Sequence, residues 1–182
     1  MDAMPEPWLR GTLTEVDAVR RGVLHALELA GEDVARWTGE LTEEQLEVRT
    51  LNVPSVGFQM RHIVRSLDRL LTYAEGRQLS EEQLGALKSE MAGGSREALF
   101  EEFALGLESA LQRVRAIAPG SYEEVRGVGR RMLPTSVGGL LVHCADHTQR
   151  HVGQLVTTAK IVMELNPASA GAGRENRFDT AL

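Results

Sequence analysis

Three histidines lie four residues apart near the end of the sequence, at His143, His147 and His151. The chain has only five histidines, so most of its imidazole is concentrated in this stretch. On a helix, residues four apart are neighbours, with Cβ atoms about 5–6 Å from each other. Two imidazoles at that spacing can bind one divalent metal ion between their ring nitrogens. The spacing therefore predicts a metal site. The alternative is a chance pair of histidines that are solvated or have their hydrogen bonds satisfied inside a core.

The apolar residues around the histidines favour the metal. Leu140, Cys144 and Leu155 recur at helical spacing, and His147 and His151 fall on the same stripe. Both rings are therefore expected to point into the protein, where a polar group needs a partner. A metal ion would satisfy both rings at once.

Two histidines from one helix need at least one further ligand from another helix, and the best candidate is His62. It lies at the flank of an apolar helical face that begins after Ser55, a suitable N-cap. With His147 and His151 it would form a site of three nitrogen ligands. Three protein ligands leave one coordination position open, which is typical of catalytic rather than structural zinc. His143 is expected to be an outer group or a polar residue near the mouth of the site.

The sequence pattern predicts helices almost throughout the chain, and these helices must position the histidines. Apolar residues recur at spacings of three, four or seven in four long segments, and the predicted helices cover residues 9–37, 56–76, 95–117 and 134–165. His25 falls off the apolar stripe of the first helix and is expected to be exposed. The fold class is thus all-α, a four-helix bundle with short connecting helices and one longer crossover.

The segments between the four predicted helices have fewer patterns that predict structure. Two similar hexads, at 41–46 and 79–84, each contain a capping box, which predicts a short helix. The link 121–133 shows no clear period, and no strand is expected there. Residues 1–165 are predicted to form a single domain, and the Ala-, Gly- and Ser-rich tail 166–182 is predicted to be flexible.

Composition excludes several classes of function. The net charge of −6, without a basic stripe, argues against nucleic-acid binding. No apolar run approaches the roughly 20 residues that span a bilayer, and the acidic start does not resemble a signal peptide. The single cysteine, Cys144, rules out an intramolecular disulfide and is expected to be a small buried apolar residue. A cytoplasmic protein is expected.

The chain resembles the DinB/YfiT-like superfamily of four-helix bundles in helix order and motif placement over roughly residues 10–163. The family pattern has one histidine on the second helix, here His62, and a His-x-x-x-His pair followed by Gly-Gln on the last, here His147, His151 and Gly153-Gln154. The resemblance implies that these histidines bind a divalent metal, zinc or nickel first and iron or manganese as alternatives. It also implies a homodimer and a small-molecule substrate.

Better-understood members of the superfamily are metal-dependent enzymes that use low-molecular-weight thiols, so the resemblance implies a thiol S-transferase. Arg61 and Arg65 could contact carboxylates of a thiol cofactor, although a solvated surface arginine is the simpler interpretation of each. Gln154 could contact the cofactor or orient a ligand ring. The alternatives are a non-catalytic metal-dependent binding or stress-response module, a metal-dependent hydrolase, and a vestigial site in a dimerising bundle. The sequence has no glutamate placed like the base of a His-Glu-x-x-His motif, which counts against a hydrolase.

Overall fold

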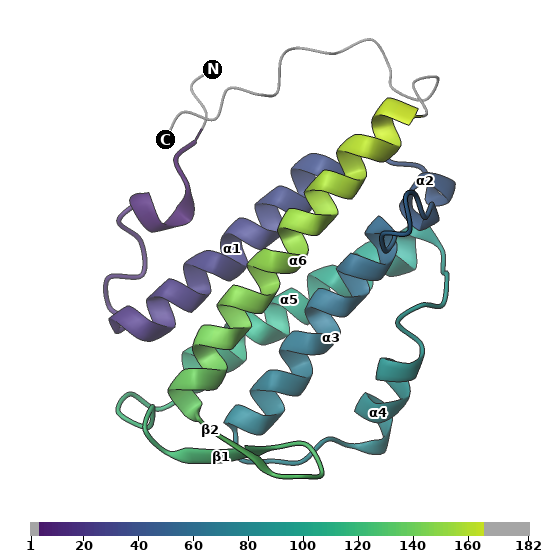
Figure 1. The fold of residues 1–182 in the computed structure, drawn as a ribbon. Coiled ribbons are helices and arrows are strands. Elements are labelled where there is room, and N and C mark those ends of the chain that lie inside the picture. The colour runs from purple at the N-terminus through teal and green to yellow at the C-terminus, as the bar shows by residue number, and fades with distance from the viewer. Residues whose placement is uncertain (1–3, 166–182) are drawn as a thin grey trace.

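A computed structural model describes residues 4–165, and it confirms the all-α four-helix bundle. Figure 1 shows the long helices lying side by side, with the two short strands at one end of the bundle. The long helices are α1 (Ala18–Thr38), α3 (Val56–Ala74), α5 (Arg96–Ala116) and α6 (Val137–Leu165). Their apolar faces meet in one core, whose fully buried side chains include Leu24, Leu27, Met60, Ile63, Leu67, Leu71, Leu141 and Leu155.

Contacts between the helices give their directions. Gln149 of α6 donates to the carbonyl of Ala26 in α1, and Lys160 lies over the ring of Trp37, so these two helices run parallel. On α3, Arg65 pairs with Glu102 of α5, and Glu75 at the C-terminal end of α3 pairs with Arg113, so these helices are also parallel. Because α3 and α5 run in the same direction, the chain between them must return along the bundle. This connection is the expected longer crossover.

The two hexads form the short helices α2 (Glu43–Glu47) and α4 (Glu81–Lys88), as predicted. In each, a Thr or Ser hydroxyl accepts from the backbone N–H three residues later, and a glutamine side chain accepts from the N-cap N–H in return. The reciprocal bonds satisfy backbone donors that would otherwise lack partners. Ser55 caps α3 in a similar way by accepting from the N–H of Phe58 at 3.1 Å.

The predicted start of the first helix at residue 9 is wrong. A short 3₁₀ helix, η1 (Pro7–Leu9), precedes left-handed backbone at Gly11 and Leu13, and α1 begins only after the N-cap Asp17. Leu13 still packs against the core. Of the apolar residues that suggested a longer helix, Leu13 and Val16 therefore reach the core from irregular backbone, whereas Leu9 is exposed.

The expectation of no strand in the link before the last helix is also wrong. Strands β1 (Val125–Val128) and β2 (Leu133–Ser136) form an antiparallel hairpin, and Val128 pairs with Leu133 across the ladder. Arg126 of β1 donates to the carbonyl of Ala74 at 2.9 Å, which joins the hairpin to the end of α3. The strands are too short and too exposed to show a clear alternation in the sequence.

No helix within residues 4–165 combines the length and the apolar character that crossing a bilayer requires. The flexible tail predicted for residues 166–182 lies outside the described residues.

Candidate metal centre

Helix α6 places His143, His147 and His151 on successive turns, but not at the centre of the core. The fully buried face of this helix is formed by Cys144, Thr148, Leu155 and their neighbours. His147 and His151 are half-buried at the edge of that face, and the side chain of His143 is 46 % exposed. The prediction that the two histidines point inward is therefore right in direction, but the rings lie at the margin of the core, where small molecules can approach.

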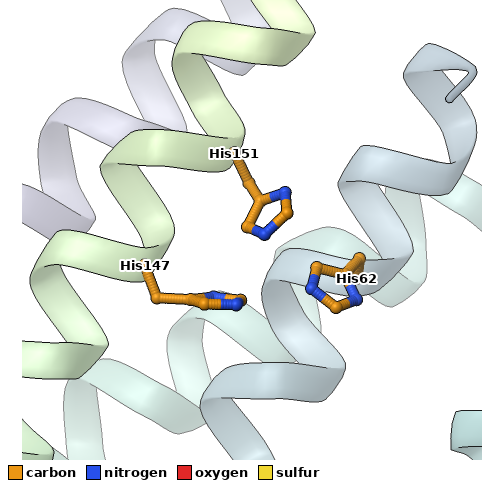
Figure 2. Close-up of side chains that lie close together, drawn as sticks. All are labelled: His62, His147 and His151. Atoms are coloured by element: carbon orange, nitrogen blue, oxygen red, sulfur yellow. The ribbon is translucent and has the colours of Figure 1, made fainter. Parts of the chain in front are cut away.

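Helix α3 brings His62 against this pair, as predicted. The ring centroids are 5.1 Å apart for His62 and His147, 4.3 Å for His62 and His151, and 4.4 Å for His147 and His151. One nitrogen from each ring lies within 4.8 Å of the others. Figure 2 shows the three rings converging in the space between α3 and α6. Among the residues that the structure describes, no carboxylate or thiol joins this group.

Two of the three rings have hydrogen-bond partners on their outer nitrogens. His62 Nδ1 lies 2.7 Å from a carboxylate oxygen of Glu90, and His151 Nδ1 lies 2.7 Å from the amide oxygen of Gln59. The Gln59 amide nitrogen donates in turn to Gln154 at 3.1 Å. Because both acceptors require a hydrogen on Nδ1, the lone pair of each ring is left on Nε2.

The electrostatics favour uncharged rings. Burial, together with the neighbouring His151, His62 and His143 rings and Arg150, lowers the pKa of His147 to about 4. Burial, His62 and Arg150 likewise lower the pKa of His151 to about 4, against the opposing effect of Glu90 and Gln154. At neutral pH both imidazoles are therefore unprotonated, which is the form that binds a metal.

The three histidines fit a divalent transition metal. They offer nitrogen donors from two facing helices, and outer hydrogen bonds fix two of the rings, as is usual for metal-binding histidines. Nitrogen donors of this kind suit zinc, nickel, iron or copper. With no carboxylate in the group, a bound divalent ion would keep its positive charge and an open coordination position.

A family model for the DinB superfamily matches residues 26–155, well over half of the chain. The chain belongs to the DinB superfamily. No curated protein matches it. Membership agrees with the bundle fold, and the matched region contains His62 and the His147–His151 pair. It also ends just after Gln154, so the Gly-Gln motif of the last helix falls inside the family match.

The two arginines predicted to contact a cofactor are engaged within the DinB bundle itself. Arg61 is buried, with 5 % of its surface exposed, and forms an ion pair with Glu47 of α2. Gly57 makes room for this pair, since a Cβ there would lie 2.6 Å from a Glu47 oxygen. Arg61 is thus not a solvated surface residue, and the simpler interpretation of it from the sequence is wrong.

Arg65 also has protein acceptors. It pairs with Glu102 at 2.6 Å and donates to the carbonyl of Ala86 at 2.9 Å. A cofactor role for Arg61 and Arg65 stays a prediction, since contact with a ligand would have to add to these bonds or replace them. Gln154 is exposed and touches the site through Gln59.

Two further predictions have clear outcomes. Cys144 is fully buried, and burial raises the pKa of its thiol to about 12, so it is the inert apolar residue that was expected. His25 is buried rather than exposed, and its Nε2 lies 3.1 Å from the hydroxyl of Thr12. The irregular segment before α1 covers this histidine, which a continuous helix from residue 9 would not do.

Glu90 and Gln59 contact rings of the trio, and neither residue was predicted from the sequence. Glu90 lies in the crossover between α4 and α5, where nothing in the sequence ties it to His62. Gln59 carries a signal that could have found it, because it lies three residues before His62 on the same helix. A buried polar residue on that face, with 1 % of its surface exposed, needs a partner inside the bundle.

Proposed function

We propose that this DinB protein is a metal-dependent enzyme that transfers a low-molecular-weight thiol to a small electrophile. The observation that carries the proposal is the trio of His62, His147 and His151, whose ring nitrogens lie within 4.8 Å of one another, with no fourth protein ligand among the described residues. The lowered pKa values of His147 and His151 leave these two rings neutral at pH 7. A divalent metal held there would lower the pKa of a bound thiol and supply a nucleophile at neutral pH.

The protein's own residues would bind and orient the reactants. The three imidazoles hold the metal without neutralising it, which favours an anionic thiolate ligand. Half-burial of the rings reduces competition by water while keeping one side accessible. Phe58 stacks on His62 with centroids 5.4 Å apart, and it offers an apolar surface beside the trio for the electrophile. Thiol class, electrophile and choice of zinc or nickel are all part of the proposal.

A metal-dependent hydrolase is the alternative enzyme, and one observation weighs against it. Hydrolases of the His-Glu-x-x-His type use a carboxylate that is free to accept a proton from water. Among the described residues, the carboxylate that contacts a ligand ring is Glu90, and its oxygens already accept from His62 and Arg69. Thiol chemistry needs no such base, because a metal-bound thiol ionises readily near neutral pH.

The test is a conjugation assay with protein loaded with Zn²⁺ or Ni²⁺. Bacillithiol, mycothiol and glutathione are each offered with a panel of small electrophiles, and the conjugate is quantified by mass spectrometry. We expect conjugate with the parent and with Glu102→Gln, a matched variant on α5, and none above background with His147→Ala. A loaded parent that accelerates no thiol reaction would leave a non-catalytic binding or stress-response module as the better proposal.

The homodimer also belongs to the proposal and is tested separately. Light scattering should give twice the chain mass of 20.0 kDa. A monomer would remove the dimer from the proposal without affecting the metal centre, since all three ligands come from one chain.

A further inference from the structure

Glu90 is a buried carboxylate in a connection that the metal centre does not otherwise use. It follows α4 by two residues, and only 5 % of its surface is exposed. One oxygen lies 2.7 Å from His62 Nδ1, and the other accepts from Arg69 Nη1 at 2.7 Å. A second Arg69 nitrogen donates to the hydroxyl of Ser66 at 2.9 Å. Both carboxylate oxygens are thus bound, and each bond has a definite direction.

The direction of these bonds fixes the proton on His62. A carboxylate is only an acceptor, so the hydrogen between Glu90 and His62 must be on Nδ1. Arg69 favours the charged carboxylate by pairing with its other oxygen. The lone pair of His62 therefore faces away from Glu90, on Nε2. The Ser66 hydroxyl lies 3.4 Å from Nε2, at the limit of a hydrogen bond, and does not oppose this tautomer.

The other ion pairs of α3 do not contact a ligand ring. Arg65 pairs with Glu102 one turn before Arg69, and Arg61 pairs with Glu47 two turns before it. Only the Arg69–Glu90 pair, among the α3 pairs that the structure describes, continues to a histidine of the centre. The same kind of interaction therefore occurs along the helix with and without a link to His62, which provides an internal control.

We infer that Glu90, held by Arg69, is a positioning residue for the metal centre, and that it acts by keeping His62 in the tautomer whose Nε2 can bind the ion. The inference rests on the metal-binding part of the proposed function. It adds the crossover between α3 and α5 to the site, because the residue that orients the α3 ligand comes from that connection. Outer partners of this kind typically change metal affinity by about 10–100-fold.

The test compares Glu90→Gln with the matched variant Glu102→Gln, which alters the neighbouring ion pair. In Glu90→Gln, the charged Arg69 should attract the new amide oxygen, which turns the amide NH₂ toward His62 Nδ1. His62 would then hold its proton on Nε2. Histidine ring ¹⁵N spectra of the metal-free proteins at pH 7.5 report which nitrogen holds the proton. Competition with a chromophoric chelator gives the Zn²⁺ affinity.

We expect His62 to be protonated on Nδ1 in the parent and in Glu102→Gln, and on Nε2 in Glu90→Gln. Zn²⁺ affinity should fall about 10–100-fold in Glu90→Gln and stay within about threefold in Glu102→Gln. A parent with the proton on Nε2 would overturn the inference even if the variant failed to fold. Equal affinities for the two variants would also overturn it. Neither readout uses thiol or electrophile, so both are independent of the transferase proposal.

Discussion

The two sides of the candidate metal centre are built in different ways. On α6, the helical repeat alone places His147 and His151 one turn apart on one face. On α3, His62 is a single histidine whose ring is held by Glu90, a residue 28 positions away in the sequence. The placement of the α6 pair is therefore local, whereas the orientation of His62 depends on how the crossover packs. A short sequence motif can therefore identify this site without containing all the residues that orient it.

The outer partners differ in the same way. A charged carboxylate with its own arginine holds His62, whereas a neutral amide, Gln59, holds His151. His147 contacts the rings of His62, His143 and His151. The α3 side thus has the stronger, charge-assisted support, and on the α6 side His151 has a neutral hydrogen bond to Gln59 of α3.

Removing a ligand from either side should cost more than removing an outer partner. We expect His62→Ala and His151→Ala each to lower Zn²⁺ affinity by more than the roughly 10–100-fold typical of an outer partner, because a nitrogen ligand is lost. His143→Ala is the matched control on the adjacent turn and should stay within about threefold. Isothermal titration calorimetry checks all three. If His143→Ala lost more Zn²⁺ affinity than His62→Ala, all the ligands would lie on α6, and His62 of α3 would not be one of them.

The second prediction tests whether Arg61 of α3 stabilises the fold through its ion pair with Glu47. Arg61→Met leaves the partly buried Glu47 without its ion-pair partner, and we expect a loss of about 2 kcal/mol in the free energy of unfolding. Arg77→Met, which breaks an exposed pair with Glu75, should cost no more than about 0.5 kcal/mol. Denaturant unfolding of the metal-free proteins measures both. If Arg61→Met were as stable as the parent, the ion pair would have no structural role and a cofactor role would gain support.

The third prediction concerns pH and the α6 side. The folded pKa of His147 is about 4, below its ordinary value of 6.5, so the unfolded state takes up a proton first as the pH falls. This histidine therefore lowers the stability of the metal-free fold as the pH drops from about 6.5 toward 4. We expect His147→Asn to reduce that pH dependence between pH 7 and pH 5, and His143→Asn, which removes only one of the weaker causes of the lowered His147 pKa, to reduce it less. Urea unfolding with chelator present measures it, and equal slopes in all three proteins would contradict the prediction.

The smallest effect is expected at Cys144, which is on α6 next to the site but faces the core. Its raised pKa of about 12 keeps the thiol protonated, so it should react with a thiol reagent only when the protein unfolds. Cys144→Ala should bind Zn²⁺ like the parent and lose only about 1 kcal/mol of stability from the removed sulfur. Rapid labelling of the folded parent would show instead that this face of α6 opens to solvent.

Much of this arrangement could be predicted from the sequence, for physical reasons. The four helices follow from apolar periodicity, the short helices from their capping boxes, and the ligand trio from the spacing of His147 and His151 together with the placement of His62. These are local signals. Glu90 was missed because its contact depends on the path of the crossover, and Arg61 was misjudged because burial of an arginine requires a partner that only the fold supplies. The hairpin was missed because its strands are short and exposed.

The most direct test of the metal centre is elemental analysis of untagged protein purified without chelator, beside His147→Ala prepared in the same way. The three-histidine site predicts about one equivalent of a divalent transition metal per chain in the parent and almost none in the variant, and the measurement also identifies the metal. A parent without metal that takes up neither added Zn²⁺ nor added Ni²⁺ would contradict the account. A variant that keeps the full equivalent would contradict it as well.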